Sequence, residues 1–228
     1  MIRAVIFDMY ETLITMFECP IYFGTQMAED AGIKNEDFQK IWSPAETDRS
    51  IGKITLEELL EKILKTYGCF SEEKKNMIIN KRKAFKMETF NHLHPEIIPM
   101  LEGLKKNDIK IGLISNCFSE EAEIIKNSIL YKYFDGVCLS YDEGIKKPDL
   151  KIYEKCMEKL NVNADECLYV GDGGSNELFA AKEIGMKPVQ AVWYLKEGTN
   201  QPTKRMKEFI NAEKPLDILN LTILGGHL

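Results

Sequence analysis

The stretch Val5-Ile6-Phe7-Asp8-Met9-Tyr10-Glu11-Thr12-Leu13 is the most informative part of the sequence, because an apolar run ends there on a carboxylate and passes at once into a short polar turn. A continuous apolar run is typical of a parallel strand that is covered on both faces. Open α/β sheets bind their ligands in the crevice outside the carboxyl ends of such strands. Asp8 is therefore a candidate catalytic residue, and the turn after it is a candidate binding loop.

Apolar runs of the same kind recur along the chain, and most of them are separated by helical patterns. This alternation predicts βαβ units, and hence an α/β fold with a Rossmann-like, doubly wound parallel sheet. Right-handed crossovers bring the turns after the strands to one edge of the sheet. After residue 201 we expect a short helix, and residues 215–224 are interpreted as an extra strand or a packing tail. The expected strands cover about residues 2–7, 109–115, 136–140, 167–171 and 189–194, and the expected helices about residues 95–107, 119–128, 149–160 and 176–185.

Residues 16–93 interrupt the alternation, since they contain amphipathic segments over 55–67 and 71–89 but no convincing strand. They predict an all-helical domain inserted into a catalytic core made of residues 1–15 and 94–228. An insertion that begins just after the Asp8 turn is well placed to act as a lid. The basic cluster Lys81, Arg82, Lys83 and Lys86 is interpreted as the solvated face of one of its helices.

The composition is that of an ordinary globular protein: 228 residues, of which 44% are hydrophobic and 29% charged. The net charge of −6 argues against a nucleic-acid partner or an anionic membrane surface, because both are bound by clustered Lys and Arg. No run of ~18 apolar residues predicts a membrane span, and the first apolar stretch is too short for a secretory signal. We therefore expect a cytoplasmic protein with reduced cysteines, no nucleic-acid partner and no membrane partner; the sequence does not indicate the oligomeric state.

Polar residues that can take part in catalysis or binding follow several of the expected strands. Ser115 and Asn116 end one strand, Lys147 lies in a basic loop before a helix, and Asp172 opens a glycine-rich acidic loop. A carboxylate such as Asp8 can act as a nucleophile that divides one difficult displacement into two easier ones. Two carboxylates that meet at one point suit Mg²⁺, which prefers oxygen ligands. Lys147 and the Ser115 hydroxyl can bind the oxygens of a transferring phosphoryl group.

This order and spacing of motifs resembles the haloacid dehalogenase-like hydrolase superfamily over about residues 1–15 and 94–195. The resemblance implies that Asp8 is the nucleophile, that Asp172 is a metal-binding acid and that the helical insertion is a cap domain. It also implies that the Tyr10 backbone carbonyl is a further Mg²⁺ ligand and that Thr12 orients the turn. The candidate catalytic residues are therefore Asp8, Tyr10, Thr12, Ser115, Asn116 and Lys147, and the candidate Mg²⁺ ligands are Asp8, Tyr10 and Asp172.

Tyr10 departs from the pattern of the superfamily's phosphatases, which usually carry an aspartate there as the acid that protonates the leaving alcohol. With an ordinary pKa of about 10, a tyrosine is a poor match for this task near neutral pH. The loss matters least when the leaving group is already acidic, as in acyl phosphates or phosphoanhydrides. Tyrosine at this position also resembles the haloacid dehalogenases proper, to which Tyr153 and Arg49 can be matched. Resemblance to those enzymes implies a site without a metal, however, whereas this chain keeps the metal-binding acid Asp172.

The sequence therefore predicts a Mg²⁺-dependent phosphatase that acts on a small phosphorylated metabolite through an aspartyl-phosphate intermediate. The alternatives are a 2-haloacid dehalogenase-type hydrolase and a weakly active or non-catalytic small-molecule binding protein. In the insertion, Arg49, Phe17 and Trp42 are candidate substrate-binding residues, although Arg49 can equally form a surface ion pair. Whether Asn176 or Glu177 joins the metal site is left open.

Overall fold

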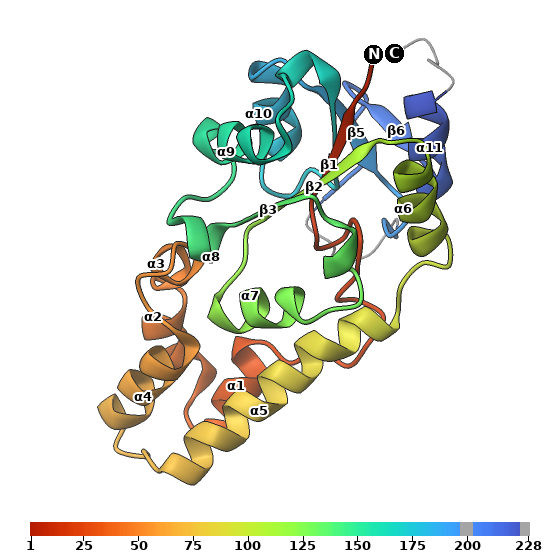
Figure 1. Cartoon of the computed structure of the whole chain (residues 1–228). Coiled ribbons are helices and arrows are strands. Elements are labelled where there is room, and N and C mark those ends of the chain that lie inside the picture. The colour runs from red at the N-terminus through yellow and green to blue at the C-terminus, as the bar shows by residue number, and fades with distance from the viewer. Residues whose placement is uncertain (197–202, 224–228) are drawn as a thin grey trace.

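The computed structural model describes residues 1–196 and 203–223, and within them a six-stranded parallel sheet forms the core (Figure 1). The strand order is β3-β2-β1-β4-β5-β6, with every neighbouring pair parallel. This order confirms the predicted Rossmann-like sheet. The strands are β1 (Ala4–Phe7), β2 (Lys110–Ser115), β3 (Gly136–Leu139), β4 (Cys167–Gly171), β5 (Lys187–Ala191) and β6 (Ile210–Ala212).

The strand order reverses its direction at β1, and this reversal positions the candidate site. From β1 the chain adds β2 and β3 on one side and then β4, β5 and β6 on the other. Phe7, the last residue of β1, pairs with Leu113 of β2 and with Val170 of β4. Asp8 therefore emerges at the switch point, between the carboxyl ends of two neighbouring strands, where open α/β sheets bind ligands.

Alternate residues of the strands face two separate apolar layers. Val5 and Phe7 of β1 belong to one core cluster and Ala4 and Ile6 to the other, and all four are fully buried. Burial on both faces explains why these strands are continuously apolar. The first layer is covered by α6 (Ile97–Lys106), α7 (Ser119–Lys126) and α11 (Pro215–Ile223), and the second by α9 (Leu150–Leu160) and α10 (Glu177–Glu183).

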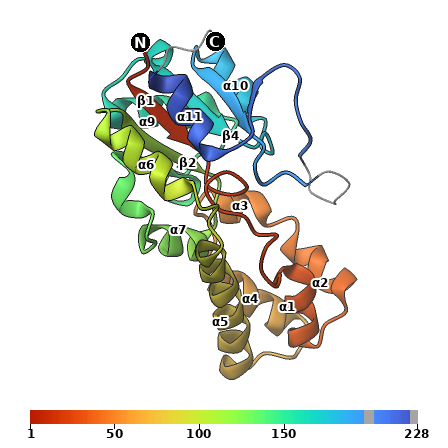
Figure 2. The ribbon, with the colours of Figure 1, turned by 90° about the vertical axis from the view of Figure 1, so that its right-hand side faces the viewer.

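The helical insertion, defined here as helices α1 to α5, lies between β1 and β2 in the sequence and projects from the carboxyl edge of the sheet (Figures 1 and 2). Its helices bury an apolar cluster of their own, separate from the two layers of the sheet. The long helix α5 returns toward the core and packs against α7. The helices are α1 (Gly24–Ala31), α2 (Asn35–Trp42), α3 (Glu46–Ser50), α4 (Leu56–Thr66) and α5 (Glu72–Glu88).

Of the two interpretations given for residues 215–224, the extra strand is wrong, because residues 215–223 form helix α11, which packs on α6 as a packing tail would. Ile218 is fully buried and Leu219 packs closely on Gly103 of α6, so the apolar spacing there is helical. The additional strand is instead β6, which the sequence did not indicate. The short helix expected after residue 201 is also wrong for residues 203–214, which contain a turn and β6 and no helix; residues 201 and 202 lie outside the described residues.

Short elements complete the described chain. They are α8 (Ser140–Glu143) and three 3₁₀ turns over Thr89–Asn91, Tyr131–Tyr133 and Ala164–Glu166. Across the described ranges, no helix combines the length and the apolar character that crossing a membrane requires.

Candidate active site

Asp8 is held at the end of β1 by contacts to both neighbouring strands and loops. Its backbone N–H donates to the Val170 carbonyl at 2.8 Å, and its Oδ1 accepts from the Met9 N–H at 2.7 Å. The Lys147 Nζ lies 2.6 Å from the same Oδ1 in an ion pair. Burial raises the pKa of Asp8 above its usual range, while Lys147 is the main influence that lowers this pKa. The result is a buried carboxylate with one cationic partner.

The turn after Asp8 is folded on itself by the side chain of Glu11. Glu11 has a φ of +56°, in the left-handed region, and its carboxylate accepts from Thr15 Oγ1 and from the Met16 N–H, both at 2.8 Å. Thr12 is fully buried, and its carbonyl accepts a hydrogen bond of 2.8 Å from Trp193 Nε1. These contacts hold the backbone of the turn at the edge of the sheet.

Asn116 fixes the loop that carries Lys147. Its side-chain Oδ1 accepts from the Lys147 N–H at 2.8 Å and its Nδ2 donates to the Lys147 carbonyl at 3.1 Å. The neighbouring Ser115 hydroxyl is fully buried and has no hydrogen-bond partner among the described residues. Because a buried hydroxyl without a partner is costly, this one is suited to a ligand oxygen.

Asp172 and Glu177 converge on Asp8. One carboxylate oxygen of each of the three residues lies within 4.8 Å of those of the other two. A set of three carboxylates offers hard oxygen ligands, which fits Mg²⁺ and does not fit metals that prefer nitrogen or sulfur. The donor chemistry of these residues therefore suits the metal that the resemblance implies.

The loop after β4 presents Asp172 with its own hydrogen bonds. Thr203 Oγ1 donates to Asp172 Oδ2 at 2.6 Å, and the Gly174 N–H donates to Oδ1 at 3.0 Å. A Cβ on Gly174 would lie 3.2 Å from Asp172 Oδ2, so the glycine keeps this approach open. Burial, and then the neighbouring Glu177 and Asp8 charges, raise the pKa of Asp172 to about 7. Protons and a cation therefore compete for this carboxylate near neutral pH.

Glu177 was not among the predicted site residues, although the sequence places it five residues after Asp172 at the start of α10. It is fully buried, and its two carboxylate oxygens accept from the Gly173 N–H and the Ser175 N–H, both at 2.6 Å. Asn176, the other residue left open, is exposed and takes the left-handed conformation at the N-cap of α10. The acid, and not the amide, faces the candidate metal site.

Tyr10 directs its side chain toward the helical insertion. Its hydroxyl is buried and has no hydrogen-bond partner among the described residues. Burial, followed by the Glu121 carboxylate, raises the pKa of Tyr10 well above its usual value. The hydroxyl is therefore an even weaker acid than an exposed tyrosine, and proton donation near neutral pH is not a task for which it is suited. The predicted role of the Tyr10 carbonyl as a metal ligand stays a prediction.

A cavity of about 380 Å³ lies between the helical insertion and the core and is bordered by Tyr10 and Asn116 from the core side. The predicted substrate-binding residues Arg49 and Trp42 both line it. Phe17 does not: it is 40% exposed and belongs to the turn before α1, so the geometry gives its predicted role no support. The remaining aromatic walls are Phe23 and Phe118.

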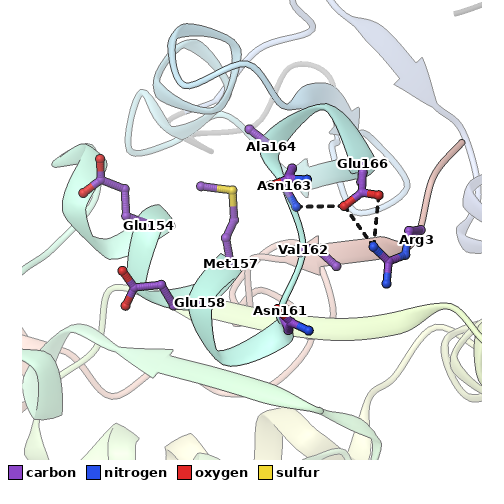
Figure 3. A pocket seen from close by; sticks show the side chains of 9 residues that line it. All are labelled: Arg3, Glu154, Met157, Glu158, Asn161, Val162, Asn163, Ala164 and Glu166. Carbon is purple, nitrogen blue, oxygen red and sulfur yellow. Dashed lines mark hydrogen bonds and ion pairs between the residues drawn. The ribbon is translucent and has the colours of Figure 1, made fainter.

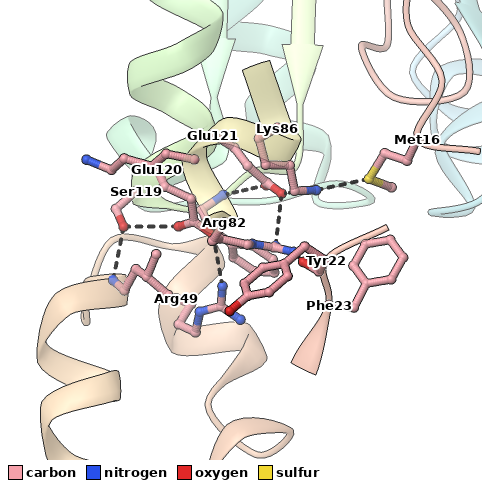
Figure 4. A network of polar contacts seen from close by, with 12 residues as sticks. Met16, Tyr22, Phe23, Arg49, Arg82, Lys86, Ser119, Glu120 and Glu121 are labelled. Atoms are coloured by element: carbon pink, nitrogen blue, oxygen red, sulfur yellow. Dashed lines mark hydrogen bonds and ion pairs between the residues drawn. The ribbon is translucent and has the colours of Figure 1, made fainter. Parts of the chain in front are cut away.

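The basic residues of the insertion do not form the solvated face that the sequence suggested. Lys81 is exposed, but Arg82 and Lys86 are 3% and 2% exposed and pair with Glu120 and Glu121 of α7 (Figure 4). Arg49 likewise pairs with Glu120, at 3.3 Å, instead of forming a surface ion pair. The expectation was wrong because the acidic partners come from a different part of the sequence, and charge patterning within one helix does not reveal them.

A larger hollow, of about 530 Å³, lies at the opposite end of the sheet (Figure 3). It is bordered by Arg3, which precedes β1, and by the residues that lead into β4, including Glu166, which pairs with Arg3 at 3.0 Å. None of the predicted site residues reaches it. The carboxyl edge of the sheet, and not this hollow, is therefore the candidate active site.

Most of the chain matches a known protein family. The model of a family described as haloacid dehalogenase-like hydrolase matches residues 2–185. A glyceraldehyde 3-phosphate phosphatase of Methanopyrus kandleri is 26% identical over 206 residues, covering 83% of this chain and 84% of the relative. The Rhythmically expressed gene 2 protein of Drosophila melanogaster is 38% identical over 85 residues, but this match spans only 33% of the relative's length and 36% of this chain.

Solved structures share the fold of the whole chain. A 2-haloacid dehalogenase from Pseudomonas syringae pv. Tomato DC3000 has a TM-score of 0.69 at 21% identity, covering 97% of this chain and 99% of that one. A wild-type enzyme of Bacteroides thetaiotaomicron, solved in complex with magnesium and inorganic phosphate, has a TM-score of 0.61 at 20% identity, covering 88% and 97%. At these identities the likeness speaks for the architecture alone, since one fold can host several activities.

Proposed function

Because the chain belongs to the haloacid dehalogenase-like hydrolases, we propose that it is a Mg²⁺-dependent phosphatase that acts on a small phosphorylated metabolite. The observation that carries the proposal is the approach of Asp8, Asp172 and Glu177 to within 4.8 Å of one another. Carboxylates at this separation repel one another unless a cation or a proton offsets their charge. Displacement of a halide by Asp8 alone gives the two additional acids no task. The phosphatase relative of Methanopyrus kandleri supports the same choice.

In the proposed reaction, Asp8 attacks phosphorus as the bond from phosphorus to the leaving oxygen breaks. Lys147 and the unpartnered Ser115 hydroxyl bind the phosphoryl oxygens, where the charge of the transition state is concentrated. Water then attacks the phosphorus of the aspartyl phosphate, which releases inorganic phosphate and restores Asp8. Asn116 acts through Lys147, because its amide holds the backbone of that residue on both sides.

Asp8, Asp172 and Glu177 would hold the Mg²⁺ ion, together with the Tyr10 carbonyl. When bound, the ion offsets the repulsion between the carboxylates and the anionic phosphoryl group. Glu177 is an addition to the ligands predicted from the sequence, and Asn176 is not among them.

Tyr10 sets the range of good substrates. A general acid usually contributes on the order of 10²- to 10⁴-fold to the rate, and the buried Tyr10 hydroxyl is a poor proton donor. Turnover is therefore expected to be slow for ordinary alkyl phosphates and faster for substrates whose leaving group is acidic.

A 2-haloacid dehalogenase activity is the second candidate, and Tyr10 is the observation that favours it. In that reaction Asp8 would displace halide from carbon, and a halide leaves without a proton. The shared fold with the Pseudomonas syringae dehalogenase is compatible with this activity. The acidic group around Asp8 weighs against it.

The deciding experiment measures phosphate release from a broad panel of phosphorylated metabolites with Mg²⁺ and with a chelator. Halide release from short 2-haloacids is measured in parallel, and Asp8→Asn is the test variant. Its control is Asp48→Asn, since Asp48 is an exposed residue of α3 that pairs with Lys53. We expect Mg²⁺-dependent phosphate release that Asp8→Asn abolishes and Asp48→Asn preserves. Halide release that persists with chelator, or no turnover in either assay, would overturn the proposal.

A further inference from the structure

The cavity between the helical insertion and the core offers more hydrogen-bond donors than the protein can satisfy. We propose that it binds a carboxylate on the alcohol part of the substrate, so that the substrate is the phosphate monoester of a small hydroxy acid. The inference rests on the phosphatase function proposed above and adds the substrate class. Figure 4 shows the polar network on which it depends.

The network contains one more positive charge than negative charges. Arg49, Arg82 and Lys86 come from the insertion, and each is at most 3% exposed. Their acidic partners are Glu120 and Glu121 of α7, which are at most 4% exposed. Buried charges require partners, so one cation of this buried network lacks a counter-charge within the network. Glu46 also lines the cavity and acts on Arg49 as a more distant negative charge, but it is exposed at the rim.

Both carboxylate oxygens of Glu120 already accept hydrogen bonds within the protein. Its Oε1 accepts from Arg49 Nη2 at 3.3 Å and from Arg82 Nε at 3.2 Å. Its Oε2 accepts from the Ser119 hydroxyl at 3.3 Å. Each carboxylate oxygen of this residue therefore already has a partner within the protein.

Glu121 is engaged in the same way. Its Oε1 lies 2.6 Å from Lys86 Nζ and 3.5 Å from Arg82 Nη2, and its Oε2 accepts from the Phe118 N–H at 3.0 Å. The acceptors of the network are therefore used within the protein. Any donor that remains must be met by water or by a ligand.

Two donors remain. Arg49 Nε is buried and has no hydrogen-bond partner among the described residues. Lys86 carries three protons, and in the described part of the chain its recorded polar contacts are Glu121 and the weakly accepting Met16 Sδ at 2.9 Å. The rings of Trp42 and Phe118 lie 3.8 and 3.7 Å from the Arg49 guanidinium carbon, which leaves only the edge of the guanidinium for a ligand. A planar carboxylate is the acceptor that such an edge binds best.

The donors stand next to the reacting centre. Lys86 Nζ lies 4.9 Å from the centre of the Tyr10 ring, and Tyr10 follows Asp8 by two residues. Tyr10 and Asn116 line the same cavity, so the cavity borders the turn after Asp8 and the end of the strand that carries Ser115. A volume of about 380 Å³ accommodates a small organic acid. One unbalanced positive charge matches a carboxylate better than a second phosphate, which brings a charge of about −1.5 to −2.

The test uses two substrates that differ in one group: 3-phosphoglycerate carries a carboxylate where glycerol 3-phosphate carries a hydroxymethyl group. We expect the wild-type protein to favour the acid by about tenfold or more in kcat/KM, the effect of one charge-assisted hydrogen bond. Lys86→Met should raise KM for the acid by about tenfold and leave KM for glycerol 3-phosphate within about twofold. Lys83→Met is the matched control: Lys83 lies on the same helix but pairs with Glu123 near the surface, and its loss should keep the preference.

Several outcomes would overturn the inference. They are equal kcat/KM for the two substrates, a Lys86→Met variant that lowers both alike, and a stronger preference for glycerol 1,3-bisphosphate than for 3-phosphoglycerate. If Lys86→Met does not fold, the comparison of the two substrates with the wild-type protein still tests the inference.

Calorimetry with D-glycerate and with glycerol gives a readout that does not depend on turnover, and only glycerate should bind. A protein that binds glycerate but hydrolyses no phosphate ester would refute the proposed function and leave the cavity assignment intact. A protein that hydrolyses phosphate esters but does not bind glycerate would refute the cavity assignment and leave the proposed function intact.

Discussion

The Lys147 ammonium lies 2.6 Å from Asp8 Oδ1, and both side chains are buried at the edge of the sheet. The pair joins the end of the central strand to the loop before α9, which Asn116 holds by two hydrogen bonds. Lys147 is also the main influence that opposes the rise in the pKa of Asp8 caused by burial. The ammonium thus favours the ionised form of the carboxylate and lies where it can bind the phosphoryl oxygens.

Lys147→Met is therefore expected to remove both contributions at once. We expect kcat for phosphate release to fall by about 10²-fold or more, the typical cost of removing one preorganised electrostatic group. Lys146→Met is the control, because Lys146 contacts the hydroxyl of Thr47 and not Asp8. Steady-state kinetics with both variants checks this prediction, and similar activity in the two would show that Lys147 is not part of the reaction.

Tyr10→Asp is expected to increase the turnover of alkyl phosphates. The substitution introduces an acid of lower pKa at the position next to the leaving group, and such an acid is worth about 10²- to 10⁴-fold in favourable cases. Substrates with acidic leaving groups, such as p-nitrophenyl phosphate, should change much less, since they need no proton.

Tyr10→Phe supplies the comparison for that variant. The hydroxyl has no partner among the described residues, so its removal should change the free energy of unfolding by less than about 1 kcal/mol. The ratio of kcat for an alkyl phosphate to kcat for p-nitrophenyl phosphate should rise in Tyr10→Asp and stay constant in Tyr10→Phe. An unchanged ratio in both variants would mean that proton donation does not limit the reaction.

The fold could be predicted largely from local patterns. Strands β1 to β4 are mainly apolar because both of their faces are buried, and α6, α7, α9 and α10 show the spacing of amphipathic helices. In β5 only the last three residues are buried, and the strand begins at the exposed Lys187, two residues before the expected start. β6 is only three residues long and has one buried residue, Ala212, so it has little pattern to detect. The apolar residues of 215–223 were compatible with a strand or a packing tail, and their packing on α6 shows that they form a helix.

The site was predictable where a residue directly follows a strand, as Asp8 and Asp172 do, because topology alone brings strand ends together. Glu177 could not be assigned in this way, since its position depends on the glycine-containing loop folding back so that Gly173 donates to it. Lys86 and Arg82 were misjudged for a related reason. Their partners on α7 lie far away in the sequence; Glu120, for example, is 38 residues from Arg82. Only the packing of the insertion on the core brings these residues together.

Glu177→Gln is expected to weaken Mg²⁺ binding by about 10- to 100-fold, the usual cost of losing a residue of a metal site or its supporting shell. A glutamine has one acceptor oxygen in place of two, so it cannot keep both bonds to Gly173 and Ser175. Asn176→Ala is the control, because Asn176 is exposed. Calorimetric titration of each variant with Mg²⁺ gives the affinities, and thermal melts check that the variants are folded. Equal Mg²⁺ affinity in Glu177→Gln and the wild-type protein would remove Glu177 from the site.

The stability of the metal-free protein should depend on pH through Asp172. Its pKa is raised to about 7 in the folded chain from an ordinary value of 3.8, so between these values the folded state binds more protons than the unfolded state. The free energy of unfolding should therefore rise as the pH falls through about 7 toward 5, and the stabilisation should be lost again as the pH rises. Urea denaturation with chelator at several pH values measures this slope. Asp172→Asn or saturating Mg²⁺ should flatten it; a slope that survives both would have to come from other groups.

Glu120→Gln is expected to weaken the contact between the helical insertion and the core. Glu120 is the shared acceptor for Arg49 and Arg82, at 3.3 and 3.2 Å, and all three side chains are buried. Burial already lowers the pKa of Arg49 to about 10, with Glu120 as the main influence in the other direction. Removing the charge of one partner in a buried ionic network typically costs about 3–5 kcal/mol, because the remaining charges stay buried without compensation.

The control is Glu123→Gln on the same helix, which breaks only the pair with Lys83 near the surface and should cost at most about 1 kcal/mol. Chemical denaturation distinguishes the two, and a Glu120→Gln variant as stable as Glu123→Gln would show that the network contributes little to holding the insertion on the core.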